Sequence, residues 1–349
     1  MKATDTHTDG GKTIDDSPFA RVSETTVSRR EQYVRRLDVW ILTPLRVIWD
    51  DTRTRVGFLI VLLYLLMGTV GVMLTPSPTT DNPKLIQPFT TLQYPLGTTG
   101  TGKPLLRAII HATPPMLKMM FAGAVFAVAV GTVVGLITGY KGGLVDRVMT
   151  TLTDMVMTIP GLPLVIVIAT ILSPRNPYVL GIILTINVWA GLARAIRSQV
   201  LTIRENSYVE ASRVLGAPTP KILREDLLPN LMPYIMINFV NAARNVIFAS
   251  VGLYFLGILP FTSLNWGVMM NLAYRGSGAL YTWSTMHWIV LPMLAIVFLS
   301  YGLILIAQGS DRLFNPRVRA RHATTIADEG TDSETDETEM AESTGRTPW

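Results

Sequence analysis

The sequence predicts an all-α integral membrane protein with about six transmembrane helices. First, the 349 residues are 49% hydrophobic and only 16% charged, with a mean hydropathy of +0.35, which is unusual for a soluble domain. Second, long uncharged segments recur along the chain. Third, the basic residues cluster beside these segments. The formal net charge of +5 therefore indicates membrane topology and not nucleic-acid binding.

Each expected span is a mostly apolar stretch of about 20 residues, because a helix rising about 1.5 Å per residue needs that many to cross the hydrocarbon. The fifth contains Arg244, so two readings are open. Either the span runs through Arg244, or it begins after it, since 245–274 is also uncharged. The expected spans are 56–74, 119–140, 155–173, 177–193, 231–259 and 288–307.

The distribution of arginine predicts the orientation of the spans. Arginines are dense before the first span, between the fourth and fifth, and after the sixth, and they are sparse in the other connections. Lys and Arg near span ends collect on the cytoplasmic side. Both termini are therefore expected in the cytoplasm, and the protein is expected to be a multi-pass component of the cell membrane.

The chain is expected to divide into four parts. Residues 1–32 and 311–349 are polar, the latter acidic, so both should be disordered cytoplasmic tails. Residues 33–55 carry apolar residues at helical spacing opposed by charges, which suits an amphipathic helix at the membrane interface; an ordinary linker is the alternative. Residues 56–310 form the transmembrane domain, with a cytoplasmic loop at 194–230.

The cytoplasmic loop contains SYVEASRVLGAPTPKILREDLLP, residues 207–229. Ser207 and Glu210 match a capping box, and Gly216 suits a left-handed helix end. Thr219 is a candidate N-cap for a second helix, which Pro229 would end. Two capped helices are more than a simple connector needs, so the loop is expected to dock onto a cytoplasmic partner.

A polar stripe marks the fifth span. Its polar residues are spaced three or four apart, which places them on one side of a helix. They are Asn238, Asn241, Arg244 and Asn245. A charge inside a span usually faces a cavity or a partner, so these residues are candidates for a translocation path. If the span begins after Arg244, that side chain is instead an interfacial anchor.

The loop resembles the E-A-A, three residues, G, then L-P motif of ABC importer permeases. The matching residues are Glu210, Ala211, Ser212, Gly216, Leu228 and Pro229, with departures at Ser212 and Asp226. Further motifs resemble the C-type subunit of the dipeptide, oligopeptide and nickel importers: Tyr94 to Thr98, Gly139 to Arg147, and Asp311 to Arg317. Residues 97–104 depart from that pattern, because the acidic residues usual there are missing.

The resemblance implies an ABC type I importer permease fold and a transport subunit that is not an enzyme. It implies a homologous second permease, two ABC ATPase subunits that bind ATP and magnesium, an extracytoplasmic binding protein and the lipid bilayer as partners. No cofactor, metal or catalytic residue is expected in this chain. The cargo is expected to be dipeptides or oligopeptides, with nickel or oligosaccharides as the alternative.

Two rival functions have little support in the sequence. A secondary transporter usually needs acidic residues inside its spans, and none lies in an expected span. A membrane hydrolase needs a nucleophile beside a base, and no such spacing is present. Residues 97–104, GTTGTGKP, look like a phosphate-binding loop, but Pro104 stands where that motif needs Ser or Thr.

Overall fold

The computed structural model describes residues 49, 51–261 and 263–314. Within these ranges the regular structure is helical, and the β pairing is an isolated bridge between Thr98 and Pro104. The expected tails at 1–32 and beyond 314, and nearly all of the amphipathic segment before α3, lie outside the described residues.

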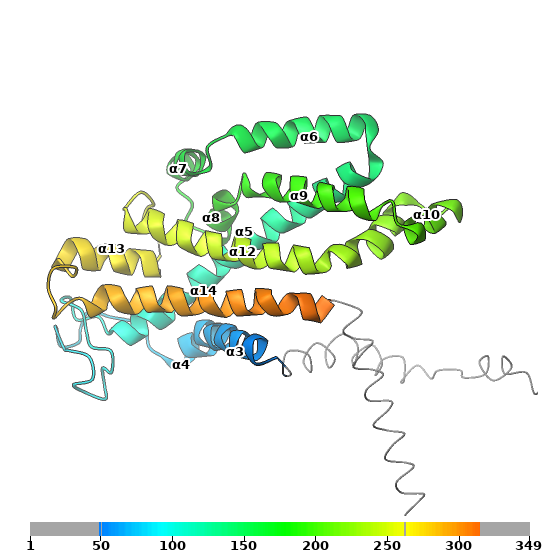
Figure 1. Cartoon of the computed structure of the whole chain (residues 1–349). Helices are drawn as coiled ribbons and strands as arrows, with labels where there is room; N and C mark the ends of the chain where they lie inside the picture. Colours follow the sequence, from blue (N-terminus) through cyan, green and yellow to red (C-terminus); the bar gives the residue numbers. More distant parts are fainter. Residues whose placement is uncertain (1–48, 50, 262, 315–349) are drawn as a thin grey trace, which may run out of the picture. The chain divides into compact units, whose positions relative to one another are not determined.

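The first span is one helix made of α3 (Thr52–Leu66), the π-helical turn η4 (Met67–Gly71) and α4 (Val72–Leu74). It begins before Val56 because Asp51 caps it: its Oδ2 accepts hydrogen bonds from Thr54 N at 3.0 Å and Thr54 Oγ1 at 2.6 Å. The last span, α14 (His287–Phe314), packs along α3 (Figure 1).

The second span is longer than the predicted 119–140, because α5 (Leu105–Lys141) is a single 37-residue helix. Pro114 and Pro115 lie inside it without ending it. Three glycines at intervals of four, Gly131, Gly135 and Gly139, face α9. A Cβ at Gly135 would lie 2.7 Å from the Ala193 carbonyl oxygen, so this stripe allows close helix contact.

The third and fourth spans are bent, which the sequence reading of two straight helices missed. α6 (Gly143–Thr158) and α7 (Gly161–Leu172) meet at 81°, and α8 (Pro177–Leu184) and α9 (Val188–Ile203) at 56°. Pro160 occupies the N-cap of α7 in extended conformation, which interrupts the helix there.

A long helix connects the cytoplasmic loop to the fifth span. α11 (Thr219–Lys221), the π-helical segment η5 (Ile222–Leu227) and α12 (Leu228–Phe255) are continuous over 37 residues. Pro229 lies inside this continuous helix, just after the π-helical segment, so the prediction that it ends a helix was wrong.

The helix ends also subdivide the predicted cytoplasmic loop, 194–230. Residues 194–203 belong to α9 and 228–230 to α12, and the segment between these helices, 204–227, is called the cytoplasmic loop below. Arg244 lies inside α12, and the 11 residues of this helix that follow it are too few to cross the hydrocarbon, which argues against the alternative start of the fifth span after Arg244.

Four described helices are long and apolar enough to cross a membrane, or up to six if each bent pair is one span, which agrees with the prediction of about six. Figure 1 shows the start of α3, the end of α14 and α10 (Ser207–Val214) at one end of the bundle. The short helix α13 (Trp266–Ser277) lies at the other end. This arrangement is the one that the arginine distribution predicts.

Candidate functional site

The cytoplasmic loop carries most of the predicted site residues, and its caps differ from those expected. α10 begins at Ser207 itself, with Asn206 at the N-cap and no side-chain cap, so the capping box was wrong. Thr219 is likewise inside α11, behind Pro218. The left-handed position of Gly216 is confirmed by its φ of 75°.

Buried apolar side chains fix α10 to the long helix. Val209 on α10 is 0% exposed, and it lies in one cluster with Ile222, at 1%, and Leu227, at 0%. Tyr140 from the end of α5 packs against the same cluster. Since two of these residues belong to the helix that continues into α12, α10 is attached directly to the fifth span.

The other side of α10 and the turn after it are open. Val214 and Leu215 are 82% and 84% exposed, just before Gly216. Glu210 and Ala211 are also exposed, and Ser212 is partly buried. Large apolar side chains at this exposure favour an interaction surface. Leu228 is partly buried and Pro229 exposed at the start of α12, away from this tip in sequence.

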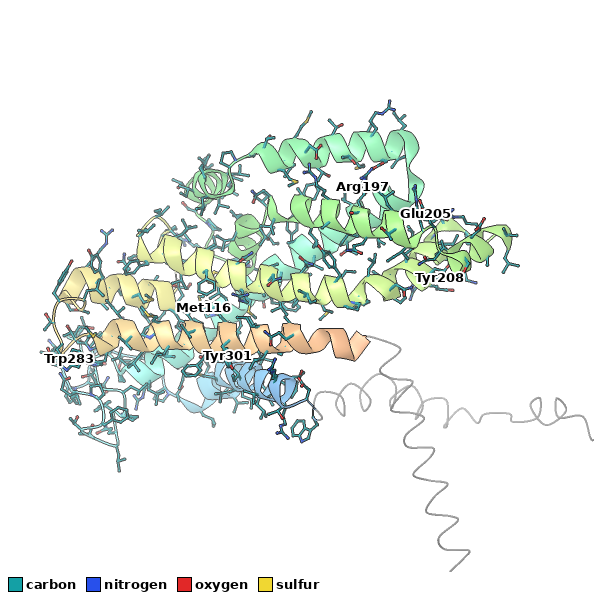
Figure 2. The ribbon with its side chains drawn as sticks, in the orientation of Figure 1. Met116, Arg197, Glu205, Tyr208, Trp283 and Tyr301 are labelled. Carbon is teal, nitrogen blue, oxygen red and sulfur yellow. The ribbon has the colours of Figure 1, made fainter. Side chains whose placement is uncertain are left out.

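Polar contacts connect α10 to the end of α5. The Arg213 guanidinium lies 5.1 Å from the centre of the Tyr140 ring, within cation–π range. Arg213 Nη2 donates to the Arg204 carbonyl oxygen at 3.3 Å, and Arg204 Nη1 donates to that of Gly139 at 3.0 Å. These residues border a cavity of about 670 Å³ that Glu210 also lines. Glu205, labelled in Figure 2, lines it as well.

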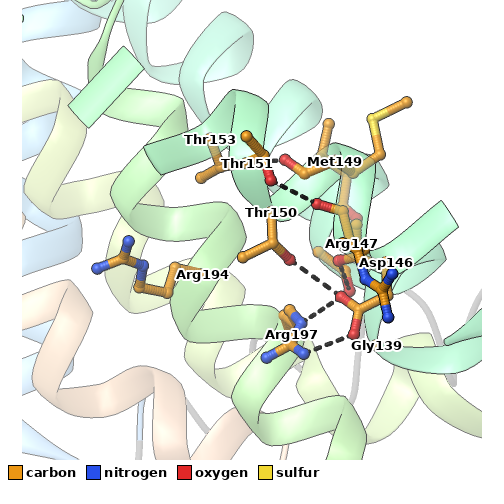
Figure 3. A network of polar contacts seen from close by, with 12 residues as sticks. Gly139, Asp146, Arg147, Met149, Thr150, Thr151, Thr153, Arg194 and Arg197 are labelled. Carbon is orange, nitrogen blue, oxygen red and sulfur yellow. Dashed lines mark hydrogen bonds and ion pairs between the residues drawn. The ribbon is translucent and has the colours of Figure 1, made fainter. Parts of the chain in front are cut away.

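A second polar network braces α6 against α9 (Figure 3). Asp146 receives two hydrogen bonds from Arg197, at 2.5 Å to Oδ1 and 2.6 Å to Oδ2, and Thr150 Oγ1 donates to Oδ1 at 3.0 Å. Arg194 pairs with Asp154. Asp146 lies in the motif Gly139 to Arg147, and both arginines lie in the basic cluster between the fourth and fifth expected spans. Nothing in the sequence indicated which acid pairs with which arginine.

The four residues of the predicted polar stripe differ in exposure. Asn241 and Asn245 are exposed on α12, while Asn238 is partly buried and donates to the Tyr234 carbonyl oxygen of its own helix at 2.8 Å. Arg244 is partly buried, and its Nε has no hydrogen-bond partner among the described residues. Exposed amides in the middle of a span need water or a protein partner, because hydrocarbon offers neither.

Three backbone amides of residues 97–104 donate hydrogen bonds within the segment, whereas those of a phosphate-binding loop point to the phosphate. The amides of Gly102 and Thr99 donate to the carbonyl oxygens of Thr99 and Lys103, each at 2.9 Å. The Lys103 amide donates to Thr99 Oγ1 at 3.0 Å. These three amides are therefore already occupied. Among the described residues, no group of three or more His, Asp or Glu could hold a metal ion.

Comparison with known proteins decides the family. The profile described as binding-protein-dependent transport system inner membrane component matches residues 131–320. The chain belongs to this family. It is 29% identical over 269 residues to the dipeptide transport system permease protein DppC of Bacillus subtilis, covering 75% of this chain and 81% of that protein.

Other relatives have similar names. The chain is 28% identical to DppC of Haemophilus influenzae, over 79% of this chain and 96% of that protein. It is 30% identical to the oligopeptide permease OppC of Bacillus subtilis, over 57% of this chain and 63% of that protein. A chain of the MetNI methionine ABC transporter, solved inward facing, aligns with a TM-score of 0.46 and 19% identity over 59% of this chain and 98% of its own, too low to support an inference.

These findings establish the general function. The chain is a multi-pass membrane permease of the ABC importer type, and the predicted resemblance to the dipeptide and oligopeptide permeases is confirmed. Family membership also confirms the predicted permease fold and the prediction of a transport component that is not an enzyme.

Proposed function

We propose that this chain is one permease subunit of an ATP-driven importer of dipeptides or oligopeptides, coupled to ATPase subunits through residues 207–229. The observation that carries the proposal is the exposed tip of the cytoplasmic loop, where Val214 and Leu215 are more than four-fifths exposed. An apolar tip with charged neighbours is typical of a protein docking surface, which combines an apolar centre with a polar rim.

The attachment of α10 supplies a route for force. Val209 is fully buried against Ile222 and Leu227, which belong to the same 37-residue helix as Asn241 and Asn245. A displacement of the tip by ATP-driven closure of the ATPases therefore moves the fifth span as a rigid element. The expected ATP and magnesium sites belong to those partners.

The exposed amide face of α12 supports a second, homologous permease. In this chain alone Asn241 and Asn245 would meet hydrocarbon, where their amide groups would lose hydrogen bonds. A facing subunit turns the same groups toward a shared aqueous path, which is the role proposed for Asn238, Asn241, Arg244 and Asn245. An extracytoplasmic binding protein would deliver the peptide to that path.

The cargo assignment rests on the relatives, whose names specify dipeptide and oligopeptide transport. Nickel or oligosaccharides remain the alternative cargo for a complex of the same type. Uptake by proteoliposomes of the assembled transporter, with labelled dipeptide, labelled pentapeptide and labelled nickel as separate substrates, distinguishes these. Accumulation of nickel without either peptide would contradict the peptide assignment.

The coupling role is tested by co-purification of the ATPases with the intact chain and three variants. Gly216→Pro cannot adopt the left-handed φ, and Glu210→Lys reverses a charge beside the tip, so both should lose most of the ATPase. Gly216→Ala should retain more of it, since nothing lies within 4 Å of an added Cβ and the cost of a left-handed Ala is about 1 kcal/mol.

Gln199→Ala is the matched control, because Gln199 is exposed on α9, outside residues 207–229. It should recover the ATPases at the level of the intact chain. Equal recovery with Gly216→Pro, Glu210→Lys and the control would refute the coupling assignment.

A further inference from the structure

The segment between α4 and α5, residues 75–104, is the outer loop, and its tip projects large apolar side chains. Phe89 is 86% exposed and Leu92 101% exposed. The surrounding stretch 85–102 contains no Asp, Glu, Lys or Arg. Exposed apolar surface of this kind requires an occupant, and the family and the proposed function do not assign one.

The tip is held rigidly. The Phe89 amide donates to the Pro95 carbonyl oxygen at 2.9 Å, which closes the turn that bears both apolar residues. Below it, Thr98 is 0% exposed, donates from Oγ1 to the Pro83 carbonyl oxygen at 2.7 Å, and accepts from the Ile86 amide at 3.1 Å. Phe89 and Leu92 are thus presented by a hydrogen-bonded frame.

The frame holds unusual backbone conformations. Leu85 and Phe89 have φ of 60° and 61°, which bulky residues rarely adopt. Gly97 has a φ of 79°, and a Cβ there would lie 2.4 Å from the Ile86 carbonyl oxygen. Strain of this kind persists only where the surroundings enforce it, and it often accompanies a functional segment.

The apolar surface continues from the membrane-spanning helix. Met73 and Leu74, the last residues of the first span, are 86% and 78% exposed, directly before the outer loop. The connection between α13 and α14 adds Tyr281 and Trp283, 84% and 86% exposed. Figure 1 shows the outer loop and this connection at the same end of the bundle, and Figure 2 places Trp283 there.

We propose that the outer loop is a membrane anchor, with Phe89 and Leu92 inserted among the lipids of the outer leaflet. Tyr and Trp concentrate at this depth, where an aromatic ring has one apolar and one hydrated side. Residues 85–102 carry no charge, so insertion of the tip among lipids removes no charged group from water. Lys84 and Lys103 flank this stretch in the sequence, and basic side chains beside an inserted segment favour the phosphates of lipids.

Spin labelling tests the anchor, because the chain contains no cysteine and a single introduced one is labelled selectively. Leu92→Cys and Phe89→Cys are compared with the control Thr79→Cys, an exposed position of the same loop before the uncharged stretch. Each labelled chain is assembled with its partner subunits in phosphatidylcholine liposomes. Accessibility to oxygen, which concentrates in lipid, is measured against accessibility to a water-soluble nickel chelate.

The ratio of oxygen to nickel accessibility should be several-fold higher at positions 89 and 92 than at 79, with or without an added binding protein. Equal ratios at the three positions would show a hydrated loop and overturn the proposal. Loss of access to both reagents would show a protein covering the tip and would also overturn it, most clearly if it appeared only when the binding protein was present.

Discussion

The cytoplasmic loop and the outer loop each present two exposed apolar residues at a tip, but the two tips are held in place by different contacts. Val214 and Leu215 follow a helix that is fixed by buried apolar side chains, whereas Phe89 and Leu92 lie on an irregular turn fixed by hydrogen bonds. The cytoplasmic loop is densely charged, and residues 85–102 carry no charge. The charged residues of the cytoplasmic loop are Arg204, Glu205, Glu210, Arg213, Lys221, Arg224, Glu225 and Asp226.

The difference teaches how similar apolar exposure serves different neighbours. Charge around an apolar centre helps to select a protein partner, which fits the docking role proposed for the cytoplasmic tip. A lipid surface penalises charge and favours neutral apolar and aromatic side chains, which fits the anchor proposed for the outer tip. The three predictions below separate the contacts that hold each loop in place, called its frame, from the exposed tip. The frame of the cytoplasmic loop is the buried cluster around Val209, and that of the outer loop is its hydrogen bonds.

The largest effect is expected from breaking the frame of the cytoplasmic loop. Val209→Asp places a carboxylate where the side chain is 0% exposed, so the variant should lose about 3 kcal/mol or more of stability. Thermal unfolding of the detergent-solubilised complex measures this. Val214→Asp, at an 82% exposed position, should unfold like the intact chain yet recover less ATPase. Equal destabilisation by both would contradict the separation of frame from tip.

A smaller effect is expected in the outer loop from Thr98→Val, which keeps the side-chain shape but removes the hydroxyl. The carbonyl oxygen of Pro83 and the amide of Ile86 each lose a partner, at a cost of about 1–3 kcal/mol. Hydrogen–deuterium exchange should accelerate in residues 82–98. Thr79→Val, at an exposed position, should leave exchange unchanged; acceleration by this control as well would argue against a frame centred on Thr98.

The smallest effect is expected from the charges of the cytoplasmic loop. Lys221 and Glu225 pair at 3.9 Å while 58% and 60% exposed, so Glu225→Gln should change stability by less than about 0.5 kcal/mol. Thermal unfolding at low and high salt measures this. A larger, salt-sensitive loss would mean that the charges hold the loop together, which would remove the contrast with the outer loop.

Much of the fold could be predicted from the sequence. Hydropathy predicted about six spans, which agrees with the four long apolar helices and two bent helix pairs. The arginine distribution gave an orientation that the placement of α3, α10 and α14 agrees with, and Gly216 was correctly expected to be left-handed. These features depend on composition over long windows or on a glycine's local freedom. Both are visible in one sequence.

The misses arise where tertiary contacts override local rules. Pro229 was expected to end a helix, but it lies inside the continuous helix from Thr219 to Phe255. The second span was expected at 119–140, but α5 begins at Leu105, across a segment that contains Arg107 and Lys118. The exposure of Phe89 and Leu92, and the pairing of Asp146 with Arg197, depend on residues distant in sequence, so no local pattern could show them.

The unbroken helix from Thr219 to Phe255 fixes the number of residues between the cytoplasmic loop and the amide face of α12. Each residue turns a helix by about 100° and lengthens it by about 1.5 Å. One residue inserted after Pro229 would rotate Asn241 and Asn245 away from their present face, while the attachment of α10 stayed in place. An insertion or deletion of one residue in this segment is therefore expected to disturb the amide face of α12 more than a substitution there.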